Sequence, residues 1–172
     1  LAANGTGNIP SFTAVNTGVS PVTAIITVTA VYTNAGITCT GNSQSFTIVV
    51  NPTPTVNPVA NQVLCNGSNT AAVNFTGSVP GTIYNWTNNN TSIGLAAAGA
   101  GNIASFVATN ATNVAQTATI TVTPNFSNTV TCAGTPITFT ITVNPIPTVN
   151  PVANQTVCAG TTVTQAFTGT VA

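Results

Sequence analysis

The sequence predicts an all-β protein built from tandem domains, and three observations support this prediction. A block of about 93 residues recurs along the 172-residue chain. Threonine and apolar residues alternate with a period of two, which is typical of strands with one buried face. No segment carries an apolar stripe at the helical period of 3.6 residues, and the Gly-rich stretch 96–101 is too short for a stable helix.

Internal repetition is clearest in two pairs of segments. Residues 1–12 read LAANGTGNIPSF, and residues 95–106 read LAAAGAGNIASF, 94 positions later. The segment PTVNPVANQ at 54–62 recurs unchanged at 147–155, 93 positions later. A period of this size matches one small sandwich domain, so each repeat is expected to fold as one domain.

The Pro-rich segment before each repeat gives the frame. With this frame we expect residues 1–50 to be the C-terminal half of one repeat, 51–143 a complete repeat, and 144–172 the N-terminal third of the next. Each partial repeat then exposes unpaired strand edges and half a core. We expect the native chain to continue through both ends; the alternative is that neighbouring molecules complement each other head to tail.

Seven short strands are expected in the complete repeat, near residues 56–65, 71–77, 82–87, 92–95, 103–109, 116–123 and 136–143. Asn- and Gly-rich turns are expected at 88–90, 99–102 and 125–128. This spacing favours an Ig-like β-sandwich. Its predicted core residues are Phe75, Tyr84, Trp86, Phe106, Ile120 and Phe139.

The chain contains no Lys, Arg, Asp, Glu or His. Acid–base catalysis, nucleophile activation and carboxylate or imidazole metal sites therefore lack their residues, and we predict neither an enzyme nor a cofactor. Phosphate neutralisation has no cation to use, which excludes ordinary nucleic-acid binding. No apolar run is long enough to span a membrane. Zero net charge and uncharged strand edges favour self-association, as in a fibre or surface layer.

Trp86 allows two interpretations. It could be a sugar-stacking platform on the surface, or the buried tryptophan of a central sandwich strand with Tyr84 on the same face. We favour the buried interpretation, because a lone aromatic residue in a strand usually packs in the core.

Cysteines occur at two corresponding places in each repeat, as Cys39, Cys65, Cys132 and Cys158. An even number in a secreted type of domain favours disulfides. We prefer a Cys65–Cys132 bond, since this pair lies within the complete repeat; Cys39 and Cys158 would then pair outside 1–172. A Cys39–Cys65 bond between repeats is the alternative, and the spacing disfavours a Cys₄ zinc site.

The joints between repeats are rich in proline, which fixes φ and extends the preceding residue. We expect them to be short and semi-rigid without help from Ca²⁺. The joint residues are Pro52, Pro54 and Pro58, repeated as Pro145, Pro147 and Pro151.

Taken together, motifs such as PTVNPVANQ, FTGSVPGTIYNW, GNIASF and GTPITFTITVNP resemble the PKD-like, Ig-like repeats of giant secreted surface proteins from Bacteroidetes-type bacteria. The resemblance covers nearly the whole chain. It implies tandem β-sandwiches, export to the cell surface or an extracellular filament, and a role in an adhesin stalk, including adhesins of gliding motility.

The expected partners are neighbouring repeats or other molecules of the same protein, with a surface glycan or another cell-surface target as a further candidate. Two other functions remain open at this point. One is a carbohydrate- or surface-binding module, in which Thr, Asn and Gln contact sugars. The other is ice binding by rows of threonine, although a 93-residue period supplies few aligned rows per domain.

Overall fold

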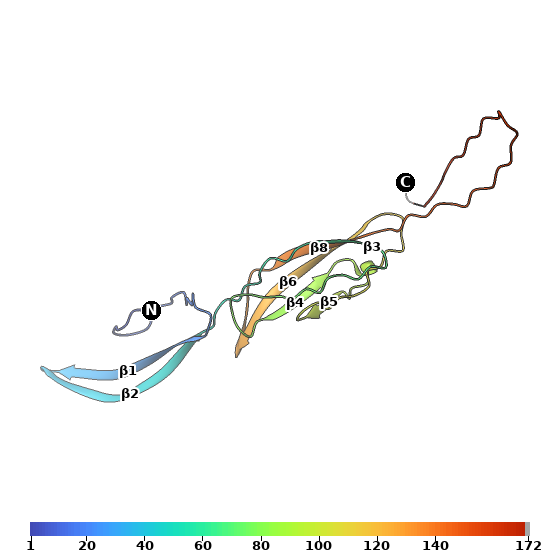
Figure 1. The fold of residues 1–172 in the computed structure, drawn as a ribbon. Coiled ribbons are helices and arrows are strands. Elements are labelled where there is room, and N and C mark those ends of the chain that lie inside the picture. The colour runs from blue at the N-terminus through green and yellow to red at the C-terminus, as the bar shows by residue number, and fades with distance from the viewer. Residues whose placement is uncertain (171–172) are drawn as a thin grey trace. The chain divides into compact units, whose positions relative to one another are not determined.

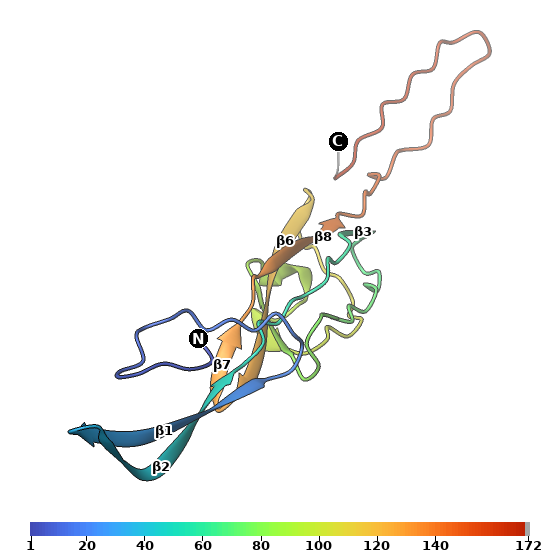
Figure 2. The same cartoon turned by 90° about the vertical axis from the view of Figure 1, so that its left-hand side faces the viewer.

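A computed structural model describes residues 1–170 and confirms an all-β chain (Figure 1). Its elements are β1 (Val22–Asn34), β2 (Ile37–Val50), β3 (Gln62–Cys65), β4 (Ile83–Asn88), the short 3₁₀ helix η1 (Thr91–Ile93), β5 (Ala98–Ala100), β6 (Gln116–Asn128), β7 (Val130–Ala133) and β8 (Ile137–Asn144). Strands β1 and β2 form an antiparallel hairpin. The other strands form one sheet in the order β3-β8-β6-β4-β5, and β7 pairs with β6, as Figure 2 shows.

The chain divides into two compact units. The first comprises Leu1–Thr55, Gly77–Ile83 and Pro124–Thr135, and the second comprises Val56–Thr76, Tyr84–Thr123 and the chain from Pro136 onwards. The first therefore combines the N-terminal hairpin with the joint and the β6–β7 tip. The second contains the main core.

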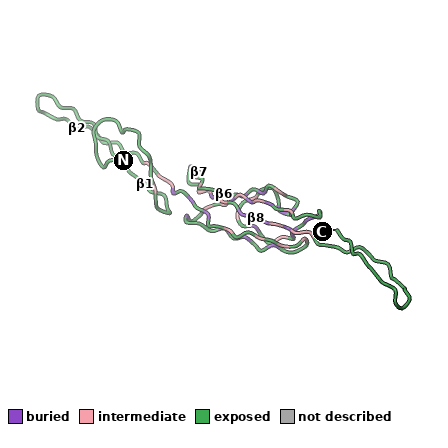
Figure 3. Tube along the Cα trace, turned by 90° about the horizontal axis from the view of Figure 1, so that it is seen from above, coloured by how far each residue is buried: buried purple, intermediate pink, exposed green. Residues whose placement is uncertain are grey.

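That core lies against β6 and β8, where purple marks the buried residues in Figure 3. Alternate residues of both strands point into it, and they are fully or almost fully buried: Ala118, Ile120, Val122, Phe139, Ile141 and Val143. The segments 56–75 and 93–108 contribute most of the remaining residues, among them Val56, Phe75 and Ile103, and β4 contributes Trp86. Threonines occupy the alternating positions, which is why a strand pattern without charge still separates an inner from an outer face.

The strand predictions hold for 82–87, 116–123 and 136–143, which became β4, β6 and β8. Only residues 62–65 of the segment 56–65 form a strand. The segments 71–77 and 103–109 are not strands. One antiparallel bridge joins them, between Val73 and Ile103, and Val107 forms a second bridge with Asn69, which lies just before the first segment. Side chains replace the missing ladder there: Gln62 Oε1 accepts from the Ala71 N–H at 2.9 Å, and Asn102 Oδ1 accepts from the Phe75 N–H at 2.9 Å.

The strand prediction at 92–95 and two of the turn predictions are wrong. Asn90 caps the 3₁₀ helix η1 by accepting from the Ser92 N–H, and Gly94 ends it with a φ of 94°. Residues 99 and 100 of the predicted turn at 99–102 belong to β5. The predicted turn at 125–128 continues β6 instead, because these residues pair with β7, which the sequence pattern did not indicate.

The N-terminal hairpin has the same strand register as β6 with β8 and β7. We call the equivalent position in the neighbouring repeat a counterpart. Val22 lies opposite Val50, and their counterparts Gln116 and Val143 lie opposite each other; the agreement continues for seven pairs, to Val28–Gln44 and Val122–Ile137. The tip follows the same rule, with Tyr32 opposite Cys39 and Phe126 opposite Cys132. Gly36, at the hairpin turn, has no counterpart, which explains why the period changes from 94 to 93 at this point.

The stability of this fold should be nearly independent of pH between about 4 and 8, because the chain has no Asp, Glu, Lys, Arg or His. Burial raises the pKa of the Tyr84 hydroxyl above its ordinary value. Folding therefore favours the neutral phenol. The contribution of the Tyr84 hydroxyl to the free energy of unfolding is complete below about pH 10 and is lost as the pH rises further. We expect a constant urea midpoint across the neutral range and a fall in alkali. A sharp unfolding transition between about pH 4 and 8 would contradict this account.

Candidate functional site

The candidate site is the joint that follows β2. Asn51 comes directly after that strand, and its amide nitrogen donates to the main-chain oxygens of Asn128 at 2.9 Å and Val130 at 3.2 Å. The Asn128 amide donates back to Asn51 Oδ1 at 3.2 Å. The start of the joint is thus hydrogen-bonded to the β6–β7 tip, 77 residues further along the chain. We call these contacts, with the proline packing described next, the joint clasp.

Proline packing completes the joint clasp. Pro52 and Pro54 are among the largest fully buried residues of the chain, together with Pro124 near the end of β6. Gly134 lies against Pro54 so closely that a Cβ at this position would be 2.9 Å from the Pro54 carbonyl carbon and nearer still to its oxygen. The Gly134 N–H donates to the Pro124 oxygen at 2.9 Å. These contacts hold the joint through apolar burial and hydrogen bonds, without any charge.

Beyond the clasp, Thr55 and Ser78 close the same unit. The Thr55 hydroxyl lies 2.9 Å from the Ser78 hydroxyl and accepts from the Ser78 N–H at 3.0 Å. The other predicted joint prolines are less buried: Pro145 is half-buried, while Pro58, Pro147 and Pro151 are exposed. The two joints therefore share a sequence but differ in burial, because only the first meets a β6–β7 tip among the described residues.

Comparison with protein-family models places the sheet and core in a known family. The model of the PKD-like domain matches residues 62–147, which is half of the chain. The chain belongs to the PKD-like domain family. No curated protein and no solved structure matched it. PKD-like domains are Ig-like β-sandwiches that serve as general structural or adhesion-type modules, are typically non-catalytic and are often extracellular.

All four cysteines of this PKD-like chain are free thiols, so the structure contains neither the preferred Cys65–Cys132 bond nor the alternative Cys39–Cys65 bond. The strand register explains why Cys65 and Cys132 form no bond. Cys65 ends β3 and lies opposite Asn144, the last residue of β8. Cys132 lies in β7, before β8 begins at Ile137. The whole of β8 separates the two positions along the sheet, whereas a disulfide needs adjacent positions.

Free thiols give a direct prediction. We expect an alkylating reagent to label Cys39, Cys65 and Cys158 rapidly in the native PKD-like protein, because these three are exposed. Cys132 is partly buried and should react more slowly, reaching the same labelling once urea unfolds the chain. Intact-mass spectrometry, with and without prior reduction, counts the labels on the native and on the urea-unfolded protein. A native protein that gains labels only after reduction would show that disulfides form in solution.

Trp86 lies in the core of the PKD-like domain, with 8% of its surface exposed. Its ring lies against Gly99 of β5, the residue directly opposite in the register. The indole Nε1 is buried and has no hydrogen-bond partner in the described structure. The other predicted core residues lie in the core cluster or pack against it; Tyr84 and Phe106 are the two that are partly exposed. A buried Trp86 removes the main support for the sugar-stacking interpretation.

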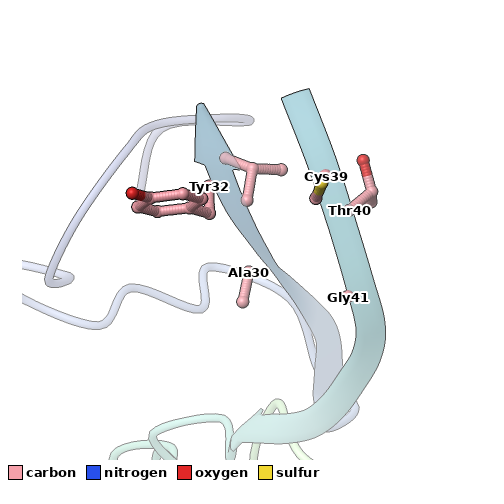
Figure 4. Close-up of a pocket in the computed structure, with 6 residues that line it drawn as sticks. Ala30, Tyr32, Cys39, Thr40 and Gly41 are labelled. Atoms are coloured by element: carbon pink, nitrogen blue, oxygen red, sulfur yellow. The ribbon is translucent and has the colours of Figure 1, made fainter. Parts of the chain in front are cut away.

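The hollows in the described part of the PKD-like chain offer little chemistry. One of about 340 Å³ lies at the tip of the β1–β2 hairpin, lined by Ala30, Val31, Tyr32, Cys39, Thr40 and Gly41 (Figure 4). Residues 1–170 hold no group of three or more side chains that could bind a metal ion. They also include no helix with the length and hydropathy to cross a membrane.

Proposed function

We propose that this PKD-like chain is a structural repeat unit of an extracellular adhesin stalk or filament. The observation that carries the proposal is the joint clasp. A stalk must transmit force from one domain to the next, and the joint is the part that would otherwise bend. The clasp ties the joint to the β6–β7 tip through buried prolines and paired asparagines. These are contacts that a stiff spacer needs and that a soluble binding module does not.

The uncharged composition supports the same role. Uncharged side chains, above all those of asparagine, glutamine and threonine, make the side-chain hydrogen bonds of this fold. Asn110 is 96% buried, and its side chain donates to the Val114 and Val143 oxygens, each at 2.8 Å, and accepts from the Thr112 N–H. Such a fold holds together at any ordinary salt concentration, because it contains no ion pair to screen. It also keeps no net charge to separate its molecules, which suits a material built from many copies.

Immunogold labelling of the cells that make this protein tests the role. An antibody raised against residues 51–143 should label the cell surface or filaments that extend from it. Labelling confined to the cell interior would overturn the proposal. A glycan array provides the matched test of the carbohydrate-binding alternative, for which we expect no specific binding. Sugar binding that Trp86→Phe abolishes would replace the structural role with a recognition role.

A further inference from the structure

Residues 66 and 67 form an Asn-Gly pair, the dipeptide in which asparagine most readily loses its side-chain amide. The pair lies in the turn after β3, which the Ser68 N–H closes by donating to the Cys65 oxygen at 3.1 Å. Gly67 has a φ of 84°, a conformation that glycine adopts without strain. Because glycine has no Cβ, nothing shields its main-chain nitrogen from the preceding side chain. The turn therefore places a reactive pair directly after the edge strand β3.

The reaction of such a pair consumes water and releases ammonia. The main-chain nitrogen of Gly67 loses its proton to solvent and attacks Cγ of Asn66, and a succinimide ring forms while the side-chain nitrogen leaves as ammonia. Water then opens the ring. Attack on one ring carbonyl gives aspartate with a normal main chain, whereas attack on the other gives isoaspartate, in which the main chain runs through the former side chain. Both products carry a carboxylate that is ionised at neutral pH.

Hydrogen bonds hold both reacting groups of the pair in the folded domain. Asn66 Oδ1 accepts from the Asn110 N–H at 2.9 Å, which fixes the orientation of the amide. The Gly67 N–H donates to the Ala108 oxygen at 2.8 Å, which hinders loss of its proton. The Asn66 N–H donates to the oxygen of Asn144, the last residue of β8, at 2.8 Å. This bond continues the parallel pairing of β3 with β8, so the turn is released when that end of the pairing opens.

The counterpart of this turn shows that its conformation does not require asparagine. It contains Ala159 and Gly160 in place of the pair, and Gly160 has a φ of 87°. The Thr161 N–H closes it by donating to the Cys158 oxygen at 3.2 Å. What Asn66 adds to the turn is therefore the contact with Asn110 and the reactivity of its amide.

We propose that Asn66 is a deamidation site that is closed in the folded domain and reacts when β3 separates from β8. The reaction gives a chain without charged side chains its first negative charge. Its isoaspartyl product also keeps the turn open, because the additional main-chain carbon moves the Gly67 N–H away from the Ala108 oxygen. The site thus keeps an irreversible record of local opening. This inference goes beyond the proposed structural role and does not depend on it.

Incubation of native and urea-unfolded protein at the same mildly alkaline pH tests the site. Anion exchange separates the products, since each deamidation adds negative charge to an otherwise uncharged chain. Peptic digestion and mass spectrometry then distinguish Asn66 from Asn4, which precedes the other glycine of this kind. We expect Asn66 to react about 10- to 100-fold more slowly in the native protein, the factor that two hydrogen bonds supply. Equal rates, or no reaction of Asn66 in the unfolded chain, would overturn the proposal.

Two matched asparagine variants test whether separation of β3 controls the reaction. Asn61→Ala removes the side-chain oxygen that accepts from the Thr140 N–H at 2.8 Å, just before β3. Asn89→Ala removes the one that accepts from the Thr119 N–H at 2.8 Å, just after β4. Native deamidation of Asn66 should accelerate by about three- to tenfold in the first variant and stay unchanged in the second. Equal acceleration in both would mean that only unfolding of the whole domain exposes the pair, and the local control would be refuted.

The purified isoaspartyl product tests the irreversible opening. Its matched control is Asn66→Ala, which lacks the side-chain contact with Asn110 but keeps a normal main chain. We expect hydrogen exchange at the Gly67 N–H to be about tenfold faster in the isoaspartyl product than in this variant, because only the product has a displaced main chain. The same exchange rate in both would show that the turn closes again after the reaction, and the record of opening would be lost.

Discussion

Replacing Gly99 with alanine should destabilise the complete repeat by about 3 kcal/mol, the upper part of the range for overpacking a well-filled core. A Cβ at this position would lie 2.6 Å from Cε2 of Trp86 and closer still to Cζ2. The indole ring is rigid and 92% buried, so it cannot move aside without opening the core. Urea unfolding followed by the fluorescence of Trp86, the only tryptophan, should show a lower midpoint and a red-shifted native emission.

A double-mutant cycle isolates this contact. Trp86→Ala alone should cost about 3–5 kcal/mol, since it removes a large core side chain. In that background Gly99→Ala should cost little, because the ring it would strike is gone. Circular dichroism replaces fluorescence for the variants that lack tryptophan. The same cost for Gly99→Ala in both backgrounds would mean that the strain lies in the β5 backbone and not in the contact with Trp86.

The parts of the fold that could be predicted from sequence are those in which period-two alternation and burial coincide. In β6 and β8 the apolar residues of TATITV and ITFTITV all face the core, so the pattern and the structure agree. The segments 71–77 and 103–109 have comparable composition, but side chains accept from their main chain in place of a strand partner. Gln62 and Asn102 accept from the first segment, and the Thr70 hydroxyl accepts from the Phe106 N–H of the second. Composition alone does not show whether a main-chain N–H will donate to a neighbouring strand or to a side-chain oxygen.

The joint shows a second limit of prediction from sequence. Proline spacing predicted a joint after β2, but it gave no indication of which residues contact these prolines. The β6–β7 tip reaches the joint because β6 continues past Thr123, and the only sequence signal there is the asparagine-rich stretch that we interpreted as a turn. Gly134 lies two residues after Cys132 in the sequence, but its role depends on the closeness of Pro54, a residue 80 positions earlier. The cysteines were misleading for a related reason, since their place in a repeat does not give their place on the sheet.

Gly134→Ala should open the joint clasp while leaving the main core intact. A methyl group here would overlap the Pro54 oxygen and lie 2.9 Å from Pro124 Cγ, and neither a main-chain carbonyl nor a proline ring can rotate away. We expect hydrogen exchange to accelerate by about 10- to 100-fold at two main-chain N–H groups, that of Ser78, which donates to Thr55 Oγ1, and that of residue 134, which donates to the Pro124 oxygen. This acceleration corresponds to roughly 1.4–2.7 kcal/mol of local opening. The native fluorescence of Trp86 should not change.

Asn51→Ala is the matched variant for this prediction, because it removes the clasp's side-chain hydrogen bonds to Asn128 and Val130 without adding bulk. Its effect should be smaller, about 1 kcal/mol, since the buried prolines remain in place. If Gly134→Ala left hydrogen exchange at the Ser78 N–H unchanged, the clasp would not be what holds the joint. If Gly134→Ala lowered the free energy of unfolding of the PKD-like domain as much as Gly99→Ala does, the joint and the core would unfold as one cooperative unit. In the stalk that we propose, the entire domain would then resist an applied force.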